Sequence, residues 1–422
     1  MKSSKGKYHT AVFVLFTLLI AHGFFCAAAP LDNKIPDRII LNLTESPATS
    51  QAVTWRTAGA VSAPRAQIEP AAELNEVGKN PITVDAVTEA VTTYIGETIY
   101  SHSAVFKSLA PDTLYEYRVG DGETWSEWSQ FRTAADSFQP FRFVFLGDPQ
   151  NDLKSVCSRI FRAAYAKAPD ARFWLFTGDT VNVGDADDQW GEFYYALGWI
   201  PRTTPMILLP GNHEYKKISN QPPKIEANKP ISLEQRGLTA LWHPQFTLPE
   251  NGPKGLEEEA YFLDYQGVRF VMLNGNEGLE DQAKWLKKVL ENNPRRWTVV
   301  SIHQPFYSTG EDRDNPYNRQ LFVKLFDKYN VDLVLQGHDH TYGRSYKLRN
   351  GARVGDNEKG TVYVVSVSGP KTYDVSKRFE SILAKSGTNR QLFQVIGVEA
   401  DILKYESYTA TGELYDSFEL SK

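Results

Sequence analysis

Short apolar runs that end abruptly at polar residues constrain the fold of this chain more than any other feature. The runs lie at residues 141–146, 173–176, 206–209, 299–302 and 331–335. Continuous apolar strands of this kind are buried on both faces, as in an α/β sheet covered by helices. Amphipathic helices are expected between them, at 154–168, 281–291 and 319–329. Later strands at 362–367 and 393–398 should complete a second sheet, so the predicted class is α/β, a mixed-sheet α/β/β/α sandwich.

The region from Ile39 to Thr133 has a different pattern. Alternating or β-rich runs are separated by turn residues and no helix is indicated, which predicts a small all-β sandwich. Its strands are expected at 39–43, 51–56, 91–99, 115–119 and 131–133. The stretch from Leu109 to Val119 resembles the Leu-x-Pro-x-Thr-x-Tyr corner of fibronectin type III domains, in which a tyrosine fixes the turn before a strand.

The N-terminal residues have the pattern of an export signal. Three lysines precede an apolar segment from Ala11 to Phe25, and small residues follow at 27–29. A membrane span needs about 20 apolar residues, and this run is shorter. Removal of the signal takes away Cys26, so Cys157 remains alone and no intramolecular disulfide is expected. We expect an exported protein, periplasmic or extracellular, with no membrane span after cleavage.

The chain of 422 residues therefore divides into three parts. They are a signal peptide at 1–29, a fibronectin type III-like sandwich at 30–136 and a larger α/β domain at 137–422, with residues 134–140 as linker. The formal net charge of −5 becomes more negative when the three N-terminal lysines leave. Such a balance argues against a nucleic-acid partner, whose binding surface is basic. The oligomeric state is not indicated.

The residues that follow the five apolar runs carry the chemical information. Each strand end bears residue types that bind metals, and four of the six histidines after the signal lie there. The motifs are Gly147-Asp148-Pro149-Gln150, Gly178-Asp179-Thr180-Val181-Asn182, Gly211-Asn212-His213-Glu214, Ser301-Ile302-His303 and Gly337-His338-Asp339-His340. Two neighbouring cations need a shared anionic ligand, with imidazoles and carbonyl oxygens to complete each shell. Five such motifs in succession are far more specific than any one of them.

The order of these motifs resembles the calcineurin-like metallophosphoesterases, and the sandwich in front of them resembles the purple acid phosphatase branch. The resemblance implies a first metal ion on Asp148, Asp179 and His340, and a second on Asp179, Asn212, His303 and His338. It implies two divalent or mixed-valence transition-metal ions, Zn, Mn or Fe, and a metal-bridging hydroxide as nucleophile for in-line attack on phosphorus. His213 would bind the phosphoryl oxygens or protonate the leaving group.

Two positions depart from the family pattern. Many metallophosphoesterases have a histidine where this chain has Gln150, and purple enzymes have a tyrosine where it has Asn182. Without that phenolate, ferric iron is less stabilised, and the protein is expected to be colourless or nearly so. Gln150 and Asn182 are therefore possible metal ligands or residues of the outer shell. Gln150 could equally cap the following helix.

Other polar residues have structural alternatives. Arg313 could bind phosphate or pair with its acidic neighbours. Glu214 could position the site or be a plain loop carboxylate, and Asp339 is expected to point away from the metals. His243 is expected to be a packed or exposed surface histidine and not a ligand, and His102 is expected to be structural. The segment from 215 to 259, with Tyr307, could form the wall that selects the leaving group, and Asn42 begins a glycosylation sequon.

The sequence therefore predicts a hydrolase of small phosphate esters, with a phosphomonoesterase of the acid phosphatase type as the main interpretation. One alternative is a phosphodiesterase of the same fold, because only the pocket walls distinguish the two esters. The other is a surface-binding protein with a vestigial metal site. The front domain is expected to contribute no metal ligand and to pack on the catalytic domain.

Overall fold

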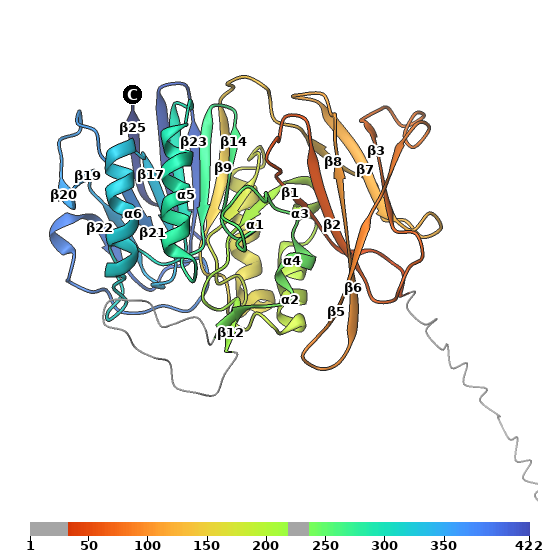
Figure 1. Cartoon of the computed structure of the whole chain (residues 1–422), viewed down its shortest axis with the longest axis horizontal. Coiled ribbons are helices and arrows are strands. Elements are labelled where there is room, and N and C mark those ends of the chain that lie inside the picture. The colour runs from red at the N-terminus through yellow and green to blue at the C-terminus, as the bar shows by residue number, and fades with distance from the viewer. Residues whose placement is uncertain (1–32, 218–235) are drawn as a thin grey trace, which may run out of the picture. The chain divides into compact units, whose positions relative to one another are not determined.

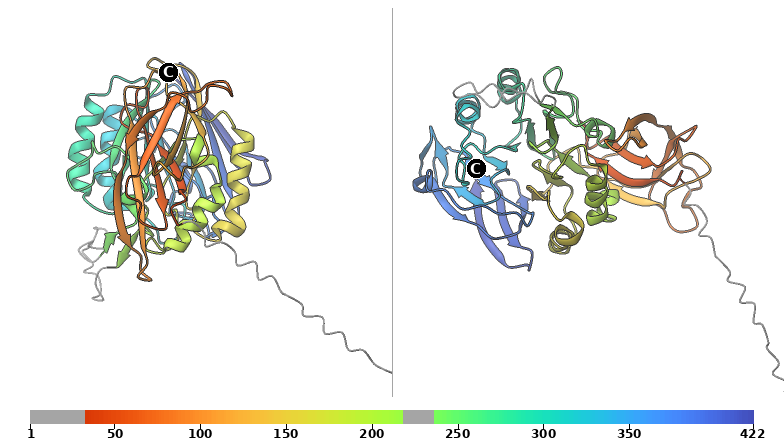
Figure 2. Two further views of the ribbon diagram at one scale, coloured as in Figure 1. Left: turned by 90° about the vertical axis from the view of Figure 1, so that its right-hand side faces the viewer. Right: turned by 90° about the horizontal axis from the view of Figure 1, so that it is seen from below.

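Two large sheets stack face to face, with α5 (Leu279–Glu291) and α6 (Pro316–Tyr329) outside one and α1 (Ser158–Lys167) outside the other (Figures 1 and 2). This computed structural model describes residues 33–217 and 236–422, and the predicted signal lies outside them. The expected α/β/β/α layering with an all-β front domain is confirmed. The boundary at 136 stays a prediction.

The first sheet has ten strands in the order β25-β24-β23-β9-β10-β11-β1-β2-β6-β5. Strands β9, β10 and β11 are parallel, so their carboxyl ends lie at the same edge. The six strands of its catalytic part are β9 (Phe141–Leu146), β10 (Trp174–Phe176), β11 (Met206–Leu208), β23 (Leu392–Val398), β24 (Ile402–Thr409) and β25 (Leu414–Ser421). The expected strand at 393–398 exists, but it lies in this sheet and not in the second.

The second sheet has seven strands in the order β14-β15-β16-β17-β21-β18-β22, of which β15, β16, β17 and β21 are parallel. They are β14 (Tyr261–Tyr265), β15 (Val268–Leu273), β16 (Trp297–Ile302), β17 (Leu333–Gln336), β18 (Tyr342–Ser345), β21 (Val362–Val365) and β22 (Leu383–Gly387). In β15, Phe270 and Met272 face the core between the sheets, while Val271 and Leu273 pack in the cluster under α5 and α6. Burial on both faces explains the unbroken apolar runs in the sequence.

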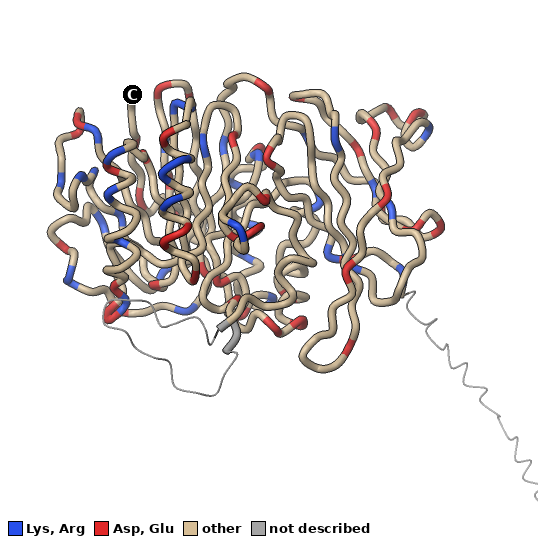
Figure 3. Tube along the Cα trace, viewed as in Figure 1, with Lys and Arg blue, Asp and Glu red and all other residues tan. Residues whose placement is uncertain are grey.

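Shorter elements complete the catalytic part. The expected helix at 154–168 begins with a π-helical turn, η1 (Leu153–Cys157), before α1. The others are α2 (Asp187–Leu197), α3 (Ile200–Thr203), α4 (Trp242–Gln245), η3 (Glu380–Ile382), β12 (Tyr215–Lys217), β13 (Arg236–Leu238), β19 (Leu348–Arg349) and β20 (Ala352–Arg353). On the exposed face of α5, Lys284 and Asp281 form an ion pair at 2.8 Å, and the helix carries acidic residues towards both ends with lysines between them (Figure 3). Within 33–217 and 236–422, no helix combines the length and apolar character required to cross a membrane.

The front domain packs strands β1, β2, β6 and β5 against a four-stranded sheet in the order β4-β3-β7-β8. The eight strands are β1 (Asp37–Asn42), β2 (Gln51–Thr57), β3 (Arg65–Pro70), β4 (Ile82–Asp85), β5 (Val87–Thr92), β6 (Thr98–Phe106), β7 (Leu114–Gly120) and β8 (Ser129–Arg132). The predicted strand at 91–99 is wrong: it spans the turn between β5 and β6. The tyrosine corner is present, since the hydroxyl of Tyr115 accepts the backbone N–H of Ala110 at 2.8 Å.

Asn42 joins the front domain to the catalytic sheet. Strand β1 lies parallel to β11, with Asn42 opposite Met206, and the Asn42 amide donates to the Met206 carbonyl at 3.0 Å. Its Oδ1 accepts the backbone N–H of Thr247 at 3.2 Å, and the side chain is fully buried. Asn42 of the sequon is therefore a structural residue, inaccessible to glycan transfer in the folded protein.

Arg38 makes a second connection, because its guanidinium donates to both carboxylate oxygens of Asp187, at 2.5 and 2.9 Å. Asp187 is the first residue of α2, and Arg56 from β2 also reaches it at 3.3 Å. The linker is fixed too, since Gln266 accepts the N–H of Ala135 and donates to the carbonyl of Gln139. The front domain thus packs on the catalytic part through specific polar contacts, as expected.

His102 lies in the core of the front domain, where Thr57 and Thr88 contact its two ring nitrogens at 2.8 Å each. Burial lowers the pKa of His102 to about 4. The unfolded chain binds this proton near pH 6.5, so folding stability should fall as pH decreases from about 6.5 towards 4. Between pH 7 and 5 this group alone should cost about 2 kcal/mol.

Urea denaturation at pH 7 and 5 measures this effect. The free energy of unfolding of the wild type should drop by about 2 kcal/mol more than that of His102→Gln, whose amide does not titrate. An equal drop in both proteins, or an NMR titration that places the pKa of His102 near 6.5, would contradict the assignment.

Candidate metal centre

The structure brings the expected ligands together in two overlapping groups. In the first group, Asp148, Asp179 and His340 have ligand atoms within 4.8 Å of one another, and in the second group Asp179, His303 and His338 do. Asp179 belongs to both groups. The amide oxygen of Asn212 joins the second group, since it lies 3.2 Å from Nε2 of His303. All the side chains proposed from the motifs for the two ions therefore converge at one place.

The ring orientation of two histidines follows from their backbone partners. Nδ1 of His303 lies 2.8 Å from the Thr177 carbonyl, and Nδ1 of His340 lies 3.1 Å from the Lys371 carbonyl. A carbonyl only accepts, so each Nδ1 carries a proton and donates it. Each Nε2 therefore faces the carboxylates, at 3.2 Å from Asp179 for His303 and 3.8 Å from Asp148 for His340. Histidines that bind metals typically donate their other ring N–H to a carbonyl or carboxylate in this way, which fixes the orientation of the ring.

Several buried polar atoms of this cluster have no hydrogen-bond partner. They include Nε2 of His340 and Oε1 of Gln150. Buried polar atoms are almost always paired, because an unpaired one costs free energy. Both of these atoms have lone pairs that a cation would accept. The residues present therefore fit a metal site.

The charges and burial of the cluster favour a cation bound beside its carboxylates. Burial raises the pKa of Asp148 well above its usual range, and the neighbouring Asp179 adds to this effect. Burial also opposes ionisation of Asp179, but His303 outweighs it and lowers the pKa of that carboxyl. Burial acts to lower the pKa of His303, yet the two carboxylates raise it to about 9. Two buried carboxylates with oxygens within 4.8 Å of each other need a neighbouring cation. Bound metal ions would supply that charge and displace the proton from His303.

Glu214 holds the loop that carries Asp179. Its fully buried carboxylate accepts the backbone N–H groups of Asp179, Thr180 and Val181 after β10, at 2.7 to 3.3 Å, and that of Gly211 at 2.7 Å. The loops after β10 and β11 are therefore fixed to each other. Of the two interpretations open from the sequence, the contacts favour a positioning role over a plain loop carboxylate.

The glycines of the motifs allow the loops to approach the carboxylates closely. A Cβ on Gly337 would lie 2.1 Å from Oδ2 of Asp148, and one on Gly211 would lie 2.2 Å from Oδ1 of Asp179. The backbone N–H of His338, directly after Gly337, donates to Asp148 at 2.8 Å, and that of His213, two residues after Gly211, donates to Asp179 at 2.8 Å. Glycine is therefore required in the Gly-His and Gly-Asn pairs because any side chain there would clash with an aspartate.

Four of the expected ligands have positive φ angles, which non-glycine residues rarely adopt. The values are 48° for Asp148, 47° for Asp179, 72° for His338 and 54° for His340. Each such conformation costs on the order of 1 kcal/mol and persists only where the surroundings enforce it. Strain of this kind is typical of functional sites.

His213 lies beside the cluster and outside both groups. Its backbone N–H donates to Oδ1 of Asp179 at 2.8 Å, and its Nε2 lies 3.9 Å from Oδ2 of the same residue. Its Nδ1 donates to the carbonyl of Asn182 at 2.6 Å. The side chain of Asn182 accepts a hydrogen bond from Nε2 of Gln150 at 3.1 Å. The two residues that depart from the family pattern are therefore paired with each other.

Arg313 also reaches the cluster, whereas Tyr307 packs in another part of the fold. One guanidinium nitrogen of Arg313 donates to the His338 carbonyl at 2.8 Å and lies 3.1 Å from Nε2 of that ring. Asp339 faces away, as expected: its Oδ2 accepts the N–H groups of Thr309 and Gly310. Tyr307 is buried and packs on aromatic side chains of the second core cluster.

Residues 218–235 of the predicted specificity loop lie outside the described part. The remainder contains β12, β13 and α4, so it has more regular structure than the sequence indicated. His243 on α4 is 42% exposed and pairs with Glu258 at 2.9 Å, as expected for a surface histidine. The hydrogen bond to Glu258 and, to a smaller extent, the one to Glu259 raise the pKa of His243 to about 10.

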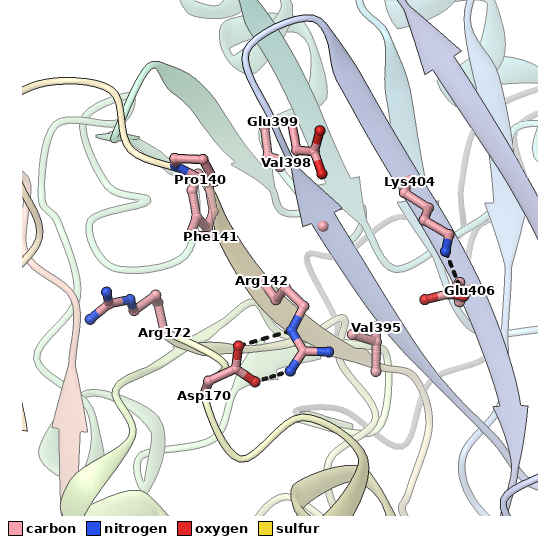
Figure 4. Close-up of a pocket in the computed structure, with 11 residues that line it drawn as sticks. Pro140, Phe141, Arg142, Asp170, Arg172, Val395, Val398, Glu399, Lys404 and Glu406 are labelled. Atoms are coloured by element: carbon pink, nitrogen blue, oxygen red, sulfur yellow. Dashed lines mark hydrogen bonds and ion pairs between the residues drawn. The ribbon is translucent and has the colours of Figure 1, made fainter.

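A pocket of about 570 Å³ lies at the start of β9, whereas Asp148 follows the end of that strand. Figure 4 shows Arg142 paired with Asp170 and Lys404 paired with Glu406 within the pocket. Arg172 points away from both pairs (Figure 4). The pocket therefore contributes nothing to the metal-ligand cluster.

Two family profiles match the chain in succession. Residues 36–133 match the purple acid phosphatase N-terminal domain, and residues 141–342 match the calcineurin-like phosphoesterases. An uncharacterised protein of Mycobacterium tuberculosis is 28% identical over 73% of this chain and 62% of its own length. Acid phosphatase type 7 of Mus musculus is 24% identical over 82% of both chains. Purple acid phosphatase 21 of Arabidopsis thaliana is 27% identical over 66% of this chain and 62% of its own length.

The chain thus spans less than two thirds of the length of the mycobacterial and Arabidopsis relatives. Two solved structures have the same fold. The purple acid phosphatase PPD1 from yellow lupin seeds has a TM-score of 0.76 and 19% identity, over 92% of this chain and 74% of its own. The structure of PhoD has a TM-score of 0.64 and 13% identity, over 93% and 92% of the two chains. With both domain profiles in this order, the chain belongs to the calcineurin-like metallophosphoesterases, in the purple acid phosphatase-like branch.

Proposed function

We propose that this protein is an exported, dinuclear metal-dependent phosphatase that hydrolyses small phosphate monoesters. The observation that carries the proposal is the pair of ligand groups that share Asp179. Two ions side by side need such a shared carboxylate. Their identity, Zn, Mn or Fe, is left to measurement, because Asn182 stands where a tyrosine would select ferric iron.

The proposed ligand sets follow the two groups. Asp148, Asp179 and His340 hold the first ion, and Asp179, Asn212, His303 and His338 hold the second. Gln150 is a further ligand candidate for the first ion, because its Nε2 is used by Asn182 and its buried Oε1 is left without a partner. Two bound ions would supply charge neutralisation for the phosphoryl group and a water of lowered pKa.

The chain's own residues supply positioning and proton transfer. His213 presents Nε2 beside Asp179, and in its imidazolium form, with both ring nitrogens protonated, it can donate the Nε2 proton to the leaving oxygen. Arg313 places a fixed positive charge next to His338 and can bind a phosphoryl oxygen. Glu214 and the backbone N–H of His338 keep the two aspartates in place, so the site is preorganised.

The first experiment compares p-nitrophenyl phosphate with bis-p-nitrophenyl phosphate on metal-loaded protein. A monoesterase should have a kcat/KM for the monoester at least about tenfold above that for the diester. The reverse preference would make the protein a phosphodiesterase. Hydrolysis of neither ester would favour a binding protein with a vestigial metal site.

Metal content tests the sharing of Asp179. Protein purified without chelator should contain up to two transition ions per chain by elemental analysis, and Asp179→Asn should lose both because both groups contain this carboxylate. Asp327→Asn is the matched control, a buried aspartate that accepts the N–H of Asn350 in another part of the fold. Full metal content in Asp179→Asn would refute the shared ligand.

Substitution of His213 tests its role as a proton donor. With an alkyl ester such as n-propyl phosphate, whose leaving oxygen must be protonated, His213→Ala should lower kcat by roughly 10²- to 10⁴-fold, the usual contribution of a general acid, with metal content unchanged. His243→Ala, which removes an exposed histidine paired with Glu258, should leave kcat near the wild-type value. Loss of metal in step with activity would instead make His213 a ligand.

A further inference from the structure

The loop after β10 is fixed at Asn182 from three sides. Its backbone carbonyl accepts the Nδ1 proton of His213 at 2.6 Å, and its side-chain oxygen accepts Nε2 of Gln150 at 3.1 Å. Its backbone N–H donates to Oε1 of Gln189 at 3.0 Å. Two glutamines therefore fix Asn182, the residue whose carbonyl accepts the hydrogen bond from His213.

Gln189 makes the more extensive of these two contacts. Its Oε1 accepts the backbone N–H groups of both Asn182 and Val183, at 3.0 and 2.9 Å, so one side chain closes the turn of this loop. Gln189 is the third residue of α2, and the first residue of that helix, Asp187, is bound by Arg38. The acceptor is thus attached to a helix whose start is fixed by the front domain.

These contacts set the orientation of the His213 ring. Because a carbonyl only accepts, Nδ1 carries a proton, and Nε2 is the nitrogen directed towards Asp179. In the imidazolium form Nε2 carries a second proton, and this is the proton that is transferred. A shift of the Asn182 carbonyl would turn the ring and move Nε2. Misplacement of a catalytic group by about 1 Å is enough to cost a large factor in rate.

We propose that Gln189 is a positioning residue for proton transfer: through the backbone of Asn182 it holds His213 with Nε2 towards the leaving oxygen. The inference rests on the proposed function. It predicts a defect that depends on the leaving group, because an alkoxide must be protonated as it departs while p-nitrophenolate leaves without a proton.

Gln189→Leu removes the acceptor and keeps the approximate size of the side chain. Its kcat for n-propyl phosphate should fall at least about tenfold, while kcat for p-nitrophenyl phosphate should fall less than about threefold. KM and metal content should be unchanged. Gln189→Glu keeps an oxygen acceptor and should recover most of the loss. Gln67→Leu is the matched control, a glutamine whose oxygen accepts Nε of Arg118 in the front domain.

Equal losses for both esters in Gln189→Leu, or no loss for either, would overturn the proposal. A second readout does not require activity. In zinc-loaded wild type, ¹⁵N NMR should find Nδ1 of His213 protonated, with its signal moved in Gln189→Leu and restored in Gln189→Glu. If wild type cleaves no phosphate ester, the proposed function fails, and an unmoved Nδ1 signal would overturn the positioning role independently.

Discussion

The carboxylate of Glu214 is the contact on which the rest of the site depends. It is fully buried and accepts four backbone N–H groups from the loops after β10 and β11. These bonds hold Asp179 in a positive-φ conformation that would otherwise be unfavourable. They also fix the loop of Asn212 against that of Asp179. Both ligand groups contain Asp179, so the geometry of both depends on this one buried acid.

The front domain belongs to the same system of contacts although it supplies no residue to the ligand groups. Its strand β1 continues the catalytic sheet at β11, where Asn42 bonds to Met206. Arg38 binds the first residue of α2, and that helix carries Gln189 next to the loop of Asn182. A continuous path of polar contacts therefore runs from the front domain to His213.

The motifs in the sequence identified residues that the fold brings together, but they did not fix the sheets. Asp148, Asp179 and His340 were assigned to one ion from the resemblance to the metallophosphoesterases, and their ligand atoms lie within 4.8 Å of one another in the structure. By contrast, the strand at 393–398 was assigned to the wrong sheet, and the run at 91–99 hid the turn between β5 and β6. Antiparallel pairing depends on contacts between distant segments, which local patterns do not contain.

By itself, the sequence determined the layers, the ends of the main strands and the residue types at each strand end. Burial on both faces and the preference of certain residues for turns both produce local sequence patterns, which can be recognised without the structure. Only the tertiary structure decided the roles of Glu214, Gln189 and Asn42. Each of these side chains acts through backbone groups far away in the chain or in another loop. Backbone N–H and carbonyl groups are the same at every residue, so nothing in the sequence marks which of them a polar side chain will bind.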